Sequence, residues 1–172
     1  MKTFIHNFRL ITLLCFGVLA SCMNEPTDLC EKETYLLPKD FKGIIIVFFD
    51  QEDGSPCEYE GEARLYKIPP SGLLKSQFRK NGGCMTDHRI RFFYPDSLAD
   101  RKELLYFMDI ENNEIPLNEN YVMLSFLPDK KDSTAFVIHL VGEVKEFVEL
   151  TNAVKRVSPH EILKSLNANK QN

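Results

Sequence analysis

A cysteine and a histidine that could act together lie four residues apart, at Cys84 and His88. A thiol beside an imidazole can serve as a nucleophile with its general base. The spacing alone does not establish this chemistry, because the preceding Gly82-Gly83 favours a turn and no Asn or Asp is placed to orient the histidine. We therefore expect no catalytic residue and no enzyme activity. A thiol-dependent enzyme using Cys84 and His88 is kept as an alternative.

The acidic segment Asp50-Gln51-Glu52-Asp53-Gly54 offers the carboxylates that Ca²⁺ prefers. Its spacing differs from that of an EF-hand loop, since Glu52 and Asp53 are adjacent and no Glu follows at the required later place. A solvated acidic turn is the better interpretation. His139 lies between two apolar residues and His160 in the first turn of a predicted helix, so neither indicates a ligand. We expect no metal site and no non-covalent cofactor.

Basic residues are concentrated between positions 64 and 91, where Asp87 is the single acidic residue. The basic residues of this segment are Arg64, Lys67, Lys75, Arg79, Lys80, Arg89 and Arg91. On one face they would form a patch that attracts phosphate- or uronate-bearing glycans, or anionic lipid headgroups. Lysine and arginine also protect edge strands from aggregation, and this second interpretation is favoured.

The chain as a whole has 172 residues, a formal net charge of -4 and 44% hydrophobic residues, which corresponds to one globular domain. The acidic balance argues against nucleic-acid binding. Residues 1–21 have the layout of a signal peptide, with Lys2 and Arg9 followed by an apolar run from Leu10 to Ala20. This run is shorter than the roughly 18 to 20 residues of a membrane-spanning helix.

The sequence Leu19-Ala20-Ser21-Cys22 resembles the lipobox of bacterial lipoproteins. The resemblance implies that Cys22 becomes the mature N-terminus and carries diacylglycerol and a fatty acyl group, enough chains for stable anchoring. An ordinary secretory signal is the alternative. Residues 22–34 are interpreted as the lipidated cysteine and a tether. Met23, in place of the Asp that retains some lipoproteins at the inner membrane, favours the outer membrane, with the periplasmic or surface-facing side left open.

Three cysteines remain in the exported part, at Cys30, Cys57 and Cys84. An exported protein meets an oxidising compartment, so one disulfide can form, and the sequence does not choose among the three pairs.

Short apolar runs separated by turn residues predict seven strands, over 44–49, 63–68, 73–78, 89–94, 104–108, 121–127 and 134–141. A 3.6-residue period predicts a short helix near 143–153, and Ser158-Pro159 with Glu161 predicts the start of another. The order favours a mainly β fold, an antiparallel β-sandwich of immunoglobulin or transthyretin type with short C-terminal helices. Its predicted bounds are 35–157, with the last helix and tail at 158–172.

Three motifs follow one another in this domain: Tyr35-x-x-Pro38, the apolar strand led by Gly43, and the turn Ile68-Pro69-x-x-Gly72-Leu73-Leu74. Over residues 35–85 this order resembles a family of small bacterial lipoproteins classed as a domain of unknown function. The resemblance implies an exported β domain behind a lipid anchor and carries over no catalytic residue, cofactor or substrate.

We therefore expect a non-enzymatic binding or structural module of the bacterial envelope, attached to a membrane through Cys22. An anionic glycan or an envelope protein is the expected kind of ligand. An accessory subunit of a surface uptake or assembly complex is a further alternative.

Overall fold

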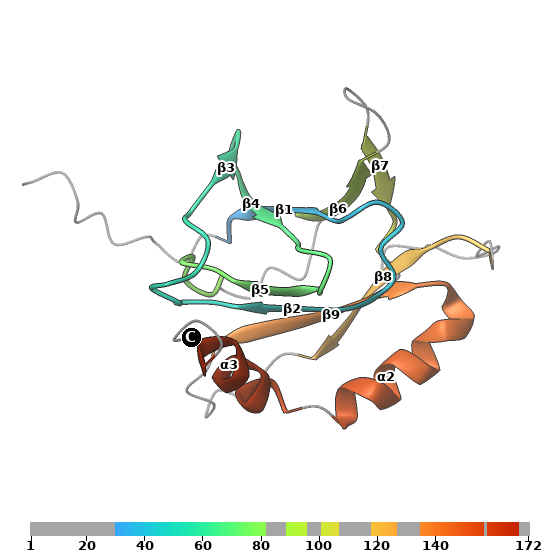
Figure 1. The fold of residues 1–172 in the computed structure, drawn as a ribbon. Coiled ribbons are helices and arrows are strands. Elements are labelled where there is room, and N and C mark those ends of the chain that lie inside the picture. The colour runs from blue at the N-terminus through green and yellow to red at the C-terminus, as the bar shows by residue number, and fades with distance from the viewer. Residues whose placement is uncertain are drawn as a thin grey trace, which may run out of the picture.

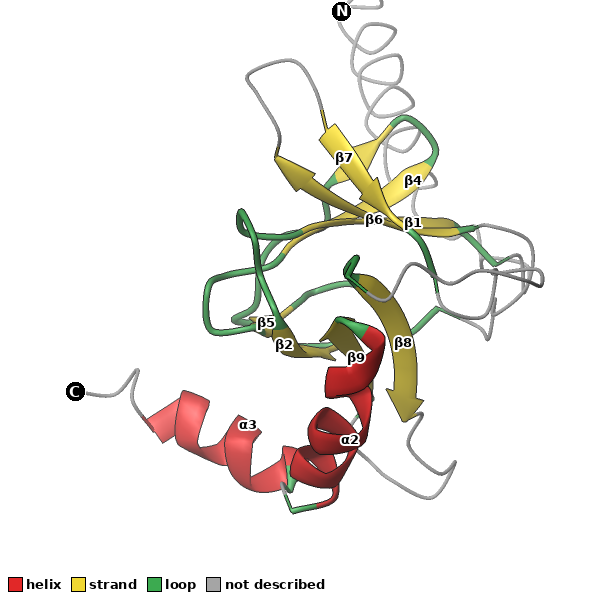
Figure 2. Ribbon diagram, turned by 90° about the vertical axis from the view of Figure 1, so that its right-hand side faces the viewer, coloured by secondary structure: helices red, strands yellow, loops and turns green. Residues whose placement is uncertain are grey.

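A computed structural model describes residues 30–81, 89–95, 101–106, 118–126, 135–156 and 158–168, and of Ser125 and Phe126 the backbone only. These residues form three layers (Figures 1 and 2). Two β-sheets lie face to face, and two helices cover the outer face of the second sheet. Cys22, Cys84 and His88, for which the sequence analysis makes predictions, lie outside the described ranges.

The first sheet has the strand order β3-β4-β1-β6-β7. Its strands are β1 (Lys32–Leu36), β3 (Tyr59–Glu60), β4 (Ala63–Lys67), β6 (Ile90–Pro95) and β7 (Arg101–Leu104). The central strand β1 runs parallel to both of its neighbours, β4 and β6. The outer pairs β3–β4 and β6–β7 are antiparallel.

The second sheet has the order β5-β2-β9-β8. Its strands are β2 (Gly43–Phe48), β5 (Leu73–Lys75), β8 (Tyr121–Phe126) and β9 (Phe136–Gly142). The pairs β2–β9 and β8–β9 are antiparallel, and the edge strand β5 is parallel to β2. Every residue of β9 is buried, because the first sheet packs on one face and the helices on the other.

The prediction of a mainly β fold with a sandwich-like pair of sheets is confirmed, whereas the pairing is mixed rather than wholly antiparallel. After β1 the chain crosses to the second sheet as β2 and then returns to the first sheet as the hairpin β3–β4. A strand that returns by such a crossover can lie parallel to its neighbour, which a tight hairpin does not allow. Turn signals in the sequence involve only neighbouring residues, so they do not predict this crossover.

The tether predicted up to residue 34 was too long, since β1 starts at Lys32. Glu33 and Tyr35 are both buried, in register with Arg64 and Tyr66 of β4. Because Glu33 is charged but faces inward, the strand lacks the usual alternation of apolar and polar residues. The sequence pattern therefore did not predict it.

Two other predicted strands were misplaced. The third strand, predicted over 73–78, ends at Lys75. The strand predicted over 104–108 lies earlier in the chain, as β7, which ends at Leu104. Residues 107 and 108 lie outside the described ranges. Gly72, which precedes β5, has a positive φ of 75°, and a Cβ there would lie 2.2 Å from the carbonyl oxygen of Ile44. Glycine at this position therefore lets β5 approach β2.

Both predicted helical regions are confirmed. A 3₁₀ turn, η2 (Val144–Glu146), leads into α2 (Phe147–Lys155), and α3 covers Pro159–Ala168. The backbone N–H of Glu161 donates to Ser158 Oγ over 3.4 Å, which is the predicted cap. No helix in the described part of the chain is long and apolar enough to cross a membrane.

The two interfaces between layers differ in how fully their side chains are buried. Between the sheets, the buried cluster is rich in rings, with Tyr35, Tyr66 and Phe92 at its centre. Between the second sheet and the helices, the buried cluster also contains rings, such as those of Phe48 and Phe136, but it is covered by half-buried aliphatic side chains such as Leu150 and Ile162.

Candidate functional site

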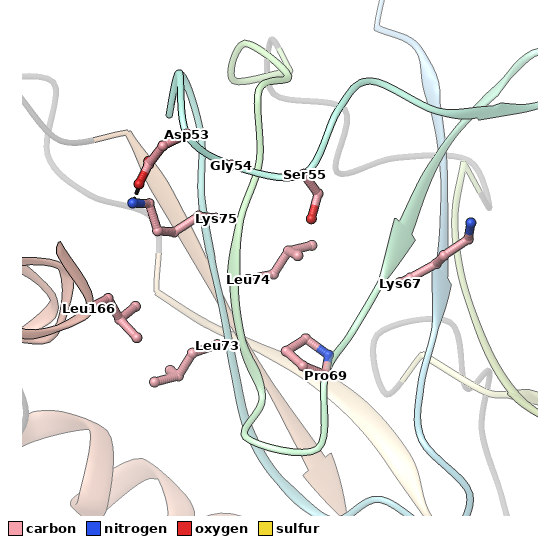
Figure 3. Close-up of a pocket in the computed structure, with 9 residues that line it drawn as sticks. All are labelled: Asp53, Gly54, Ser55, Lys67, Pro69, Leu73, Leu74, Lys75 and Leu166. Atoms are coloured by element: carbon pink, nitrogen blue, oxygen red, sulfur yellow. Dashed lines mark ion pairs between the residues drawn. The ribbon is translucent and has the colours of Figure 1, made fainter. Parts of the chain in front are cut away.

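An open cleft of about 320 Å³ lies along the edge strand β5 (Figure 3). Its wall is made by Asp53, Gly54, Ser55, Lys67, Pro69, Leu73, Leu74, Lys75 and Leu166. These residues come from β4, β5, α3, the acidic turn after β2 and the turn before β5. The cleft is therefore the place where the edge of the second sheet meets α3.

The acidic turn is held directly on β5. The backbone N–H of Ser55 donates to the carbonyl of Lys75 over 2.8 Å, and that of Gln77 donates to the carbonyl of Ser55 over 2.9 Å. A Cβ on Gly54 would lie 2.7 Å from the backbone of Lys75, so only glycine allows this approach. The turn thus places the Asp53 carboxylate on the Lys75 ammonium group, as the dashed line in Figure 3 shows.

Lys75 also connects the cleft to α3. Its Nζ donates to Asn167 Oδ1 over 2.6 Å, and its side chain is 10% exposed. The acidic turn was predicted to be solvated, but its Asp53 forms an ion pair with Lys75. The sequence did not reveal this pair, because the two residues are 22 positions apart. Among the described residues, no group of three or more His, Cys, Asp or Glu side chains is arranged to hold a metal ion.

A second cavity, of about 240 Å³, lies between the second sheet and the helices. It is lined by Ile44, Ile46, Ser71, Leu73, Ile138, Val154 and Ile162. Leu73 borders both this cavity and the cleft, because β5 lies between them. A cleft with both polar and apolar walls and an aliphatic cavity are thus neighbours at the same strand.

A polar cluster occupies one end of the space between the sheets. The Tyr35 hydroxyl donates to Glu33 Oε2 over 2.8 Å, and Asn81 Nδ2 donates to Glu33 Oε1 over 3.1 Å. Burial raises the pKa of Glu33 despite these hydrogen bonds. The Asn81 side chain also makes two hydrogen bonds with the backbone of Glu31. Its Oδ1 accepts from the Glu31 N–H, and its Nδ2 donates to the Glu31 carbonyl.

Arg64 closes this cluster. Its guanidinium group pairs with Glu31, donates to the carbonyl of Arg79 and lies over the Phe78 ring, 5.0 Å from the centroid. All these contacts are internal, so the cluster fastens the start of the domain to the first sheet. Sequence reasoning missed it because its members are far apart in the chain.

His139 lies at the centre of β9 and is 1% exposed. The rings of Tyr35 and Phe92 meet its imidazole edge-on at centroid distances of 5.3 and 5.0 Å. Neither ring nitrogen has a hydrogen-bond partner among the described residues, and burial lowers the pKa of His139 to about 3. The imidazole is therefore neutral at physiological pH. Among the described residues, its side chain is held by ring contacts and not by hydrogen bonds.

The predicted basic patch is spread over both sheets. In addition to Arg64 and Lys75, Lys67 pairs with Glu58, and the Arg91 guanidinium makes two hydrogen bonds to Glu103 at 2.7 and 2.6 Å. Arg89 donates to the backbone carbonyl of Cys30 over 3.0 Å. Arg79 and Lys80 are exposed. Four of the seven predicted residues thus have a carboxylate partner, and the segment does not form one uniformly positive face.

Of the predicted disulfide cysteines, Cys30 is disulfide-bonded and Cys57 is free and exposed. Cys84 and His88 both lie outside the described residues. The alternative of a thiol-dependent enzyme that uses these two residues therefore stays a hypothesis. His160 is described and sits in the first turn of α3, as predicted.

Fold and sites together define a class: a two-sheet β-sandwich domain with a helical outer layer and a cleft at one sheet edge. The chain belongs to a family of unknown function, DUF6843, whose model matches residues 30–134. This match confirms the resemblance over residues 35–85 to a family of unknown function.

Among solved structures, a candidate lipoprotein from Bacillus anthracis is similar, with a TM-score of 0.48 and 12% identity over 66% of this chain and 71% of that chain. No curated protein matches the chain.

Proposed function

We propose that this chain is a lipid-anchored protein of the bacterial envelope, whose sandwich domain is a non-enzymatic binding module. The observation that carries the proposal is the Leu19-Ala20-Ser21-Cys22 sequence at the end of a signal-like segment. Removal of residues 1–21 leaves Cys22 as the lipidated N-terminus. Met23 supports the outer membrane as the location.

The structure adds a supporting feature, which is the way the domain begins. Cys30 is disulfide-bonded, and Glu31 is bound by Asn81 and Arg64, so the fold is secured from its first described residues. Seven residues lie between Cys22 and Cys30, so eight Cα–Cα steps join them. At about 3.3 to 3.6 Å per residue, they reach on the order of 25 to 30 Å. The domain would therefore stay close to the membrane surface.

Metabolic labelling with an alkyne-bearing fatty acid tests the anchor. The parental chain is expected to incorporate the label, and Cys22→Ala is expected to lose it and remain at precursor size. Cys15→Ala is the matched control, since Cys15 lies in the same segment without small residues before it. Undiminished labelling of Cys22→Ala would contradict the proposal.

Protease treatment of intact and permeabilised cells then gives the side of the membrane. Digestion of the domain on intact cells would direct the search for ligands to external glycans. Protection until permeabilisation would direct it to peptidoglycan and periplasmic proteins.

A further inference from the structure

The cavity between the second sheet and the helices has an aliphatic wall. Six of its seven lining residues are Ile, Leu or Val, and the seventh, Ser71, contributes a hydroxyl. They come from β2, β5, β9, α2, α3 and the turn before β5. Protein interiors are close-packed and contain few voids larger than a water molecule. A space of about 240 Å³ with such a wall favours an apolar occupant over water.

The helix α3 packs loosely over the cavity. None of its residues is fully buried, although Ile162, Leu163 and Leu166 all face the buried cluster. Ile162 lines the cavity and Leu166, one turn later, lines the cleft. One face of α3 therefore runs over both depressions.

A cationic group stands at the polar end of this arrangement. Lys75 follows Leu73 by two residues on β5, so both side chains point to the helix-covered face of the sheet. The Lys75 ammonium group has three N–H donors; it forms an ion pair with Asp53 and donates a hydrogen bond to Asn167. Within the described part of the chain, the third donor has no partner and can bind a further oxygen. Figure 3 shows Leu73 and Leu166 on the same side of the cleft as Lys75.

We propose that the cavity and the cleft together bind a single-chain anionic amphiphile of the fatty-acid type. Its alkyl chain occupies the aliphatic cavity beneath α3, and its carboxylate accepts a hydrogen bond from Lys75. Burial of the chain is favourable in proportion to the apolar surface removed from water. This inference rests on the proposed function, since a binding module held at a membrane is surrounded by such molecules.

Photo-crosslinking in cells that produce the full chain tests the cavity. The probe is a fatty acid with a mid-chain diazirine and a terminal alkyne, and mass spectrometry locates its adducts. Light-dependent adducts are expected in peptides from β5, α2 and α3. Val154→Phe fills the cavity and is expected to reduce them at least tenfold.

Val148→Phe is the matched control, because it makes the same change on the same helix at a position that is 72% exposed. It is expected to leave labelling unchanged. Ile162→Phe fills the cavity from α3 and serves as the blocking variant should Val154→Phe not accumulate. Equal labelling of the blocking and control variants, or adducts confined to other parts of the chain, would overturn the proposal.

The headgroup is tested by Lys75→Gln, which is expected to lower labelling by the acid probe several-fold. Lys164→Gln, an exposed lysine of α3, is expected to have no effect. A probe with an alcohol in place of the carboxylate is expected to label the parental chain several-fold less. Equal labelling by acid and alcohol would overturn the assignment of an anionic headgroup.

The same samples separate this proposal from the lipid anchor. Label on the Cys22 peptide that forms without light reports anchoring, whereas light-dependent adducts under α3 report the cavity. Anchor label without cavity adducts overturns only the ligand site. Cavity adducts without anchor label contradict the proposed anchoring and leave the ligand site supported.

Discussion

The sheet–sheet interface and the sheet–helix layer differ in how completely they are packed. Between the sheets, the Tyr35 ring stacks on those of Tyr66 and Phe92 at centroid distances of 4.7 and 4.6 Å, and all three side chains are at most 1% exposed. Against the outer face of the second sheet, α2 contributes one buried residue, Phe147, and α3 contributes none.

This difference separates a rigid part from an adaptable part. Stacked and edge-on rings fix one another's positions, because each contact depends on geometry. Half-buried aliphatic side chains on a short helix have no such constraint and leave the cavity beneath them. Segments with few buried contacts open at lower free energy than the core. We therefore assign stability to the sheet–sheet interface and ligand binding to the helix layer.

The largest effect is expected for Phe92→Ala. Removal of a fully buried ring between the sheets should lower the free energy of unfolding by roughly 3 to 5 kcal/mol. Urea denaturation followed by circular dichroism measures the loss. A decrease below about 1 kcal/mol would show that the interface is less tightly packed than the ring contacts indicate.

His139 should make the same interface sensitive to acid. Its pKa is lowered to about 3 in the fold, so the unfolded chain binds more protons between about pH 6.5 and pH 3, and stability must fall as the pH falls through this window. Between pH 7 and pH 4 the loss should be roughly 3 kcal/mol. Urea midpoints should show a much flatter pH dependence for His139→Leu. An identical pH dependence in the two proteins would contradict the buried neutral imidazole.

The disulfide at Cys30 should stabilise the first sheet and leave the helix layer unaffected. Arg89 binds the Cys30 carbonyl, and Asn81 binds Glu31, so both sides of the interval 82–88 are held beside Cys30. With Cys57 free, we propose Cys84 as the partner. Cys30→Ser should lower stability by roughly 2 to 4 kcal/mol. Non-reducing peptide mapping tests the pairing, and a crosslink containing Cys57 would refute it.

The smallest effect is expected in the helix layer. Leu163→Ala removes a half-buried side chain of α3, and the loose packing there should limit the loss to about 1 kcal/mol. Compared with Phe92→Ala in the same denaturation assay, it should shift the urea midpoint several-fold less. Losses of equal size would erase the distinction between the two layers.

Local signals predicted the helices well. Ser158, Pro159 and Glu161 form a capping sequence that acts over a single turn, so neighbouring residues were sufficient. The same holds for β2, whose apolar run is bounded by Gly43.

Features that depend on distant residues could not be predicted. Glu33 is buried in β1 because Tyr35 and Asn81 bind its carboxylate, and Asn81 is 48 residues away. The parallel pairing of β1 with β4 depends on the crossover to the second sheet. The cleft was missed for the same reason, since Asp53, Lys75 and Leu166 meet only in the fold.

Hydrogen exchange of the full chain, followed by mass spectrometry, tests the contrast between the layers most directly. We predict that amides of α3 (Pro159–Ala168) exchange through openings of low free energy, whereas those of the central strand β9 (Phe136–Gly142) exchange only on global unfolding. Equal protection of α3 and β9 would contradict the division into a rigid interface and an adaptable layer.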